Sequence, residues 1–331
     1  LFELGYAISD RISGPHFTYV DPRRHRETIA MIENARRLSY LFQRGGFSKD
    51  DIMISIPATE EGIWATHHLR KDEIKVNLYL VSGIMHAATC AEAGAAAITI
   101  PVGRILDLFE RQQYKGCQHL STHPGIAIIL SILAYFRINR VPTRVIGAGF
   151  REFAEIGALG GFDAVSISEH HLDRLKWRSE IVSSPNDNSV ASTRGRQAKY
   201  PTQFLASRTK QFMKGFAPSS RRMAYRILTG ALEELKLGMD KIDSAVSTEL
   251  RRQYSLETLD LQTLYRDITS KKKTTQTPES NPTARSQKEK YSGYMTSKTS
   301  RKVEGLFKDE KSSMSEFRDL HRSMMDSDEV F

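Results

Sequence analysis

Short apolar runs alternate with amphipathic stretches over the first half of the chain. The apolar runs predict strands over 17–20, 52–56, 74–81, 96–102, 143–146 and 164–167. Between them, apolar residues recur every three to four positions, which predicts helices over 26–42, 63–69, 84–93, 105–112, 126–136 and 153–159. Six strand-then-helix repeats predict a parallel sheet, in either a wound α/β fold or a β/α barrel.

The stretch DIMISIPATEEGI, residues 51–63, shows one such repeat most clearly. An apolar strand stops at Pro57, and Thr59 is placed to cap a helix that starts with Glu60 and Glu61. The turn between a strand and the following helix usually carries the chemistry of a parallel β/α fold. The strand contains a serine, Ser55, among Ile and Met residues.

Polar residues inside the predicted strands share faces. Lys75, Asn77 and Tyr79 alternate with apolar residues, so they lie on one side of their strand. Ser55 and Thr99 stand out in their own strands in the same way. In a barrel these side chains would point into the lumen, where sites lie near the carboxyl ends of the strands.

The chain divides into β/α units and three later segments. We expect residues 1–178 to form the β/α units and residues 179–220 to be a basic, low-complexity insertion. Residues 221–254 should form a helix and 270–331 a disordered tail. The helix carries an apolar stripe, which favours packing on the barrel over a contact in a homodimer. Its members are Leu228, Leu232, Leu235, Met239, Ile242, Val246 and Leu250.

Composition and charge exclude several classes of protein. The 331 residues carry a net charge of +9, concentrated in the basic insertion. Since that insertion lacks interleaved aromatic residues, a solvated loop is favoured over nucleic-acid binding. No apolar run reaches the roughly 20 residues that span a membrane. Two cysteines, Cys90 and Cys117, indicate buried thiols in a reducing compartment such as the cytoplasm.

Several motifs, in this order along the chain, resemble the transaldolase family of the larger, cytosolic type. They are IMISIPATEEGI, VNLYLVSGIMHAATCAEAGAAAITIPVGRILD, HPGI, TRVIGAGFREFAEIGALGGFDAVSIS and the late helix MAYRILTGALEELKLGMDKI. The resemblance implies a TIM-type (β/α)8 barrel of the pentose phosphate pathway. Such an enzyme moves a dihydroxyacetone unit between sugar phosphates through a Schiff base on a strand lysine. That chemistry needs no metal and no cofactor.

The resemblance also assigns site residues, and the catalytic positions differ from the family pattern. Ser55 stands at the position of the Schiff-base lysine and Tyr19 at that of the acid/base glutamate. The matching substrate-binding positions are Asn77, Tyr79 in place of a threonine, Thr99, Arg104, Gly149 in place of a serine, and Arg151. A hydroxyl cannot form an iminium, so the family mechanism is expected to fail at residue 55.

The barrel is expected to be incomplete. The resemblance implies two earlier strands with a catalytic aspartate and a Thr-Asn-Pro-Ser turn, and neither motif occurs in the opening residues. We therefore expect an N-terminally truncated barrel of about six β/α units, whereas closure with a shear of eight needs eight. Three functional hypotheses remain. The first is a transaldolase-like protein with a degenerate catalytic centre, and the second is an inactive pseudoenzyme that binds sugar phosphates or another protein. The third, which ranks last because no base stands beside Ser55 in the sequence, is a different lumen chemistry built on Tyr19, Tyr79 and Ser55 without an imine.

Overall fold

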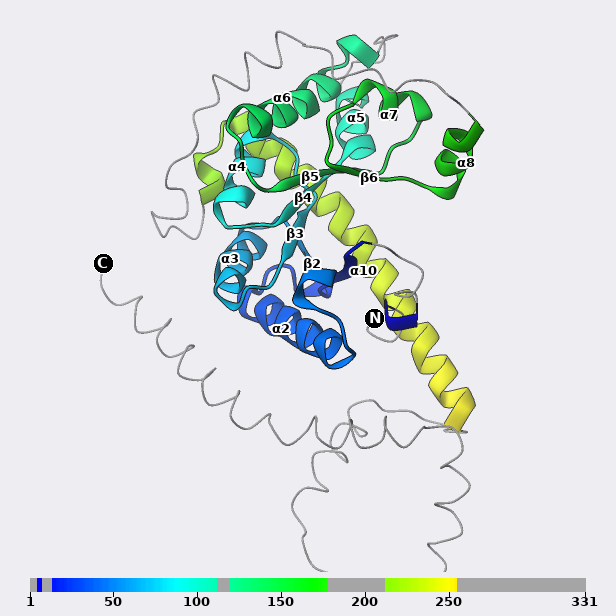
Figure 1. Ribbon diagram of the computed structural model, residues 1–331. Coiled ribbons are helices and arrows are strands. Elements are labelled where there is room, and N and C mark those ends of the chain that lie inside the picture. Colours follow the sequence, from blue (N-terminus) through cyan, green and yellow to red (C-terminus); the bar gives the residue numbers. More distant parts are fainter. Residues whose placement is uncertain (1–4, 8–13, 112–119, 178–211, 255–331) are drawn as a thin grey trace, which may run out of the picture. The chain divides into compact units, whose positions relative to one another are not determined.

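Six parallel strands form a curled half-barrel in the computed structural model, which describes residues 5–7, 14–111, 120–177 and 212–254. The strands lie side by side in chain order, each paired with the next (Figure 1). They are β1 (His16–Tyr19), β2 (Ile52–Pro57), β3 (Val76–Tyr79), β4 (Ala97–Pro101), β5 (Arg144–Ala148) and β6 (Ala164–Ser166). The predicted incomplete TIM-type barrel is confirmed.

Helices follow the strands, and α2, α3, α4 and α6 lie along one side of the sheet in Figure 1. The α-helices are α2 (Thr28–Arg44), α3 (Glu60–Leu69), α4 (Ile84–Glu92), α5 (Val102–Glu110), α6 (Pro124–Ile138), α7 (Phe153–Ala158), α8 (Glu169–Trp177) and α10 (Pro218–Tyr254). Short 3-10 turns are η1 (Pro22–Arg24), η2 (Lys49–Asp51), η3 (Arg70–Asp72), η4 (Leu120–Thr122) and η5 (Phe212–Gly215). All six predicted strands and the predicted helices of the β/α units are present, with ends that differ by a few residues, and α8 was not predicted.

The turn from β2 to α3 has the predicted cap. The Thr59 hydroxyl accepts a hydrogen bond from the Gly62 amide at 3.0 Å and donates one to the His25 carbonyl at 2.9 Å. The first contact satisfies a free amide in the first turn of α3. The second joins this turn to the residues that follow β1, so the carboxyl ends of β1 and β2 are held together.

The core lies between the sheet and the helices outside it. Alternate residues of the strands, such as Ile54, Ile56, Leu78 and Ile98, are buried there. This is the face that alternation assigns to the helices. Cys90 is buried in the same core, as predicted, and Cys117 lies outside the described residues.

The end of the predicted insertion corrects the domain boundaries. Residues 212–220 were expected to belong to a loop, but Phe212, Met213 and Phe216 are buried and α10 already begins at Pro218. The three apolar residues pack in the core, which the basic composition of the surrounding sequence did not indicate. The rest of the insertion, up to residue 211, and the predicted tail at 270–331 lie outside the described residues.

The prediction that the whole of α10 packs on the barrel is wrong for its second half. Leu228 and Leu232 are buried, whereas Leu235, Ile242 and Val246 of the same stripe are exposed. An apolar period reports which face of a helix is apolar, but not how far the neighbouring element extends.

Candidate functional site

Strand pairing brings the predicted lumen residues together at the carboxyl ends of neighbouring strands. Ser55 is paired in register with Tyr19 of β1 on one side and with Asn77 of β3 on the other. Tyr79 is in register with Thr99 of β4. Five positions that the sequence singled out therefore form one cluster.

A chain of hydrogen bonds runs through this cluster. The Thr99 hydroxyl donates to Asn77 Oδ1 at 2.9 Å, and Asn77 Nδ2 donates to Ser55 Oγ at 3.2 Å. Ser55 is also the register neighbour of Tyr19 on β1. Each hydroxyl and amide is used within the chain, and none of these groups is an amine that could form an imine.

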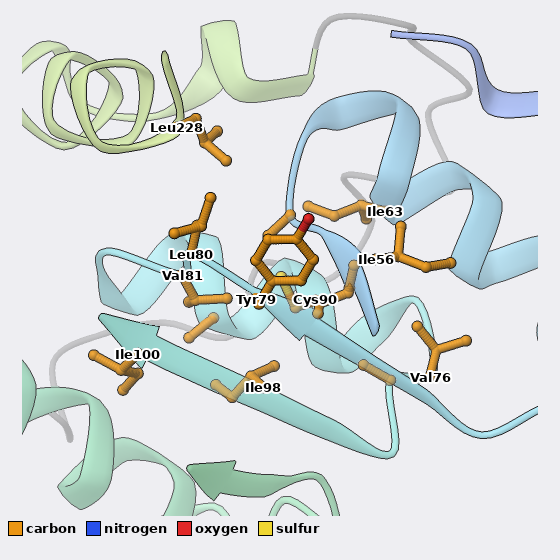
Figure 2. Close-up of a cluster of buried hydrophobic side chains, with 14 of the residues drawn as sticks. Ile56, Ile63, Val76, Tyr79, Leu80, Val81, Cys90, Ile98, Ile100 and Leu228 are labelled. Carbon is orange, nitrogen blue, oxygen red and sulfur yellow. The ribbon is translucent and has the colours of Figure 1, made fainter. Parts of the chain in front are cut away.

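Two tyrosine rings of the cluster contact each other. The Tyr19 and Tyr79 rings meet edge to face with centroids 5.6 Å apart. Ser55 has 0% of its surface exposed, while Tyr19 is 48% exposed at the rim. Figure 2 shows Tyr79 among apolar side chains that include Ile56 of β2, Ile63 of α3 and Leu228 of α10. A solvent-borne carbonyl compound has no open approach to Ser55 in this arrangement.

The pKa values of both phenols are raised, so both stay neutral near pH 7. Burial raises the pKa of Tyr79 far above its usual value, and the charges of Tyr19 and Asp21 act in the same direction. Burial also raises the pKa of Tyr19, although the neighbouring Ser55 hydroxyl opposes the shift. Neither phenol is therefore poised as a base near neutral pH.

Lys75, the lysine closest in sequence to Asn77, does not reach the strand-end cluster. Lys75 precedes the strand and pairs with Asp50 at 2.7 Å, on the surface at the amino end of the sheet. Lys49 pairs with Glu73 in the same region. Both amines lie at the end of the sheet opposite the strand-end cluster.

Arg151, one of the two arginines that the resemblance assigns to substrate binding, is ion-paired with three nearby carboxylates. Arg151 donates from Nε to Glu155 at 2.8 Å, and its terminal nitrogens contact Asp107 at 2.5 Å and Glu110 at 2.9 Å. Burial opposes the charge of Arg151, but these hydrogen bonds raise its pKa. They also hold the pKa of Glu110 below its usual value. Three carboxylates outweigh one guanidinium, so the local charge is negative.

The second arginine contacts α10. Arg104 makes two hydrogen bonds to the Glu234 carboxylate, at 3.2 and 2.6 Å, in an exposed pair. Gly149, the remaining predicted position, has a positive φ of 69° and open space beside it. Its carbonyl accepts from the Gly103 amide at 3.0 Å, which joins the turns after β4 and β5. The cluster and the two arginines are thus separate groups of contacts.

A buried histidine, His86, connects two of the turns at the carboxyl ends of the strands, and the sequence did not predict this role. His86 Nε2 contacts the Ala58 carbonyl at 2.7 Å, and its Nδ1 lies 3.3 Å from the Ser82 hydroxyl. The ring therefore links α4 to the turns after β2 and β3, with Phe216 of the segment after η5 beside it. Ser82 lies four positions from His86, but Ala58 lies 28 positions away, and no local pattern in the sequence indicates that second contact.

The described residues hold no group of three or more His, Cys, Asp or Glu side chains arranged as for a metal ion. Within the same residues, no helix is long and apolar enough to cross a bilayer.

Parallel strands, outer helices and a polar cluster at the strand ends define a protein of the β/α-barrel class. A sequence model described as Transaldolase/Fructose-6-phosphate aldolase matches residues 1–222. The chain is 34% identical over 235 residues to a transaldolase of Alteromonas mediterranea, a match that covers 71% of this chain and 72% of that protein. It therefore belongs to the transaldolase/fructose-6-phosphate aldolase family.

Two other relatives match over shorter stretches. Identity is 36% to a transaldolase of Cellvibrio japonicus, over 57% of this chain and 60% of the relative. It is 37% to a transaldolase of Methylobacillus flagellatus, over 52% of this chain and 54% of the relative. The matched stretch thus spans between about half and three quarters of the relatives' lengths.

Proposed function

We propose that this chain is a transaldolase-like protein of the pentose phosphate type whose catalytic centre is degenerate. One observation carries the proposal. The residue at the lysine position, Ser55, is fully buried and already hydrogen-bonded to Asn77. A Schiff base needs an uncharged amine that the ketose carbonyl can reach, and Ser55 supplies neither the amine nor the access.

The two tyrosines support the same proposal. Tyr19 stands where the resemblance implies a carboxylate, and Tyr79 where it implies a small hydroxyl residue. Their rings meet edge to face, and the Tyr79 ring is larger than the side chain that the resemblance implies, so the proposal assigns both rings to blocking the approach of a ketose. The proposal therefore attributes the loss of transfer to three positions, of which residue 55 removes the covalent step and the other two block access.

A coupled sugar-phosphate assay on three proteins tests this proposal. The wild type should stay at background. A triple variant, Ser55→Lys with Tyr19→Glu and Tyr79→Thr, should rise above it, but only slowly, because it restores these three residue types and not the aspartate that the resemblance implies on an earlier strand. The double variant Tyr19→Glu with Tyr79→Thr is the matched control and should remain silent. Turnover by the wild type, or equal rates in the double and triple variants, would contradict the proposal.

A second candidate function is sugar-phosphate binding without transfer. The observation that favours it is the Arg104–Glu234 pair, which is exposed to solvent on both sides. A phosphate offers the same bidentate geometry as the carboxylate and could replace it. Arg151 contributes less on this account, because three carboxylates already surround it.

Removing the charge of Glu234 should raise the affinity for a sugar phosphate. In Glu234→Gln the Arg104 guanidinium loses its charged partner and is free to bind the phosphate. Because an exposed ion pair contributes little, we expect the affinity for the sugar phosphate to rise by at most about five-fold. Titration calorimetry with fructose 6-phosphate measures it. Glu233→Gln is the control, since Glu233 pairs with Lys236. Equal affinities of the two variants for fructose 6-phosphate would show that Arg104 does not bind the phosphate.

The proposal includes a cytoplasmic location, sugar phosphates as ligands and no metal or cofactor. A homodimer and a protein-binding role stay as alternatives. The family resemblance supports the location and the ligands. Neither nucleic acid nor a membrane is part of the proposal.

A further inference from the structure

The second half of α10 presents an exposed apolar stripe. Leu235, Ile242 and Val246 are 40%, 47% and 53% exposed, and Met239 between them is partly buried. Just before this part of the helix, the same stripe is buried at Leu232. The exposed part therefore begins where the contact of α10 with its own chain ends, and it covers about three turns of helix.

The spacing along the exposed stripe is symmetric. Steps of four, three and four positions separate Leu235, Met239, Ile242 and Val246, so the apolar pattern is the same from either end. A twofold contact between identical chains has this property, because residue i of one copy meets residue j of the other while j meets i. In an antiparallel pair, Leu235 would lie against Val246 of the second copy and Met239 against its Ile242. All four side chains would then be covered.

The residues on the two flanks of the stripe fit the same antiparallel pairing. One flank carries Lys236 and Asp243, and antiparallel pairing places each lysine beside the aspartate of the other copy. The opposite flank carries Gly238 and Ala245, whose small side chains let the two helix axes come close. In a parallel pair Asp243 would face Gly238, and no opposite charges would meet. The charges therefore favour the antiparallel orientation.

The two charged side chains keep room for a partner from another copy. Asp243 contacts Arg23 of η1 at 2.5 Å, and Lys236 contacts Glu233 at 2.9 Å. The Asp243 side chain is still 54% exposed and the Lys236 side chain 29% exposed. A carboxylate has two acceptor oxygens and an ammonium group three donor hydrogens, so each group can take a second partner.

We propose that two copies of the chain associate through the second halves of their α10 helices, which cross antiparallel at the exposed stripe. The partner is a second copy because the apolar spacing and the flanking charges are complementary to themselves. A contact of about three helical turns is smaller than a standard interface of roughly 1,600 Å², so the dissociation constant is expected in the micromolar range. This association goes beyond the proposed function and does not depend on it.

Sedimentation velocity of the full chain tests the association. The wild type should form dimers, and a chain that stays monomeric at about 200 μM would overturn the proposal. Ile242→Asp places a carboxylate in the apolar contact and should weaken the dimer by at least ten-fold. Leu237→Asp is the matched control, because Leu237 is 63% exposed on the same part of α10 but lies off the stripe. It should change the dissociation constant by less than two-fold, and equal dimer strength in the two variants would contradict the proposed contact.

Cysteine cross-linking tests the orientation. Antiparallel pairing brings residue 235 of one copy to residue 246 of the other, whereas the two copies of residue 235 lie about 16 Å apart along the helix axis. A disulfide needs Cα atoms within about 7 Å. Oxidation should therefore link Leu235→Cys to Val246→Cys when the two variants are mixed, and neither variant to itself. The wild type, with Cys90 and Cys117, is the control for background cross-links. A Leu235→Cys dimer that forms above this background without the second variant would indicate a parallel pair and overturn the proposal.

Discussion

Replacing Gly62 by alanine should lower the free energy of unfolding by about 3 kcal/mol, the upper part of the range for overpacked sites. A Cβ at this position would lie 2.0 Å from the Pro57 carbonyl oxygen and 3.1 Å from the Ile56 side chain. The carbonyl cannot move freely, because it accepts a hydrogen bond from the Thr59 amide at 2.8 Å. The first turn of α3 would have to shift away from β2.

A second glycine is the matched control for this experiment. Gly230 lies in the interior of α10 with open space around it. Gly230→Ala should raise the free energy of unfolding by about 0.5–1 kcal/mol, because alanine is the better helix former. Urea unfolding followed by circular dichroism measures both variants. Similar free energies of unfolding for the two variants would contradict the prediction and show that the turn from β2 to α3 can accommodate a Cβ at residue 62.

Acidification from pH 6.5 to 4 should cost about 3 kcal/mol of stability through His86 alone. Burial lowers the pKa of His86 to about 4, against a value of 6.5 in an exposed ring, and the Ala58 carbonyl opposes the shift. Since the pKa is lower in the folded state, the unfolded chain binds the extra proton. The contribution is complete above pH 6.5 and is lost as the pH falls towards 4.

The variant His86→Gln separates this effect from other titrating groups. Its amide can still donate to the Ala58 carbonyl but does not titrate. Unfolding free energies of the two proteins, measured between pH 4 and 7, should converge as the pH falls, because only the wild type loses the histidine contribution. His123, whose pKa burial also lowers, is present in both proteins and cancels in the difference. A constant difference over this range would exclude His86 as the source.

The repeats and the lumen cluster could be predicted because both depend on local pattern. Apolar runs with turn residues between them locate each strand, and alternation alone puts Ser55, Asn77 and Thr99 on faces that the sheet brings together. The cap at Thr59 follows from residue type and position. These features need no knowledge of which distant segments meet.

The features that were missed depend on distant contacts. Glu234 contacts Arg104 across 130 positions, and nothing local to either residue indicates the pair. Phe212, Met213 and Phe216 are buried although they follow a basic, polar stretch. The stripe of α10 has the same pattern where it is buried at Leu228 as where it is exposed at Val246. Burial of a helix face is set by the extent of its neighbour, which sequence period does not report.

The most direct test of the central claim is the intact mass of the wild type after incubation with fructose 6-phosphate and borohydride. Borohydride reduces an imine to a stable amine, so any Schiff base would leave a covalent three-carbon or six-carbon adduct. With Ser55 at the lysine position we expect an unchanged mass. An adduct on the wild type, mapped to Lys75, Lys214 or any other lysine, would contradict the account and show that the chain retains imine chemistry at another site.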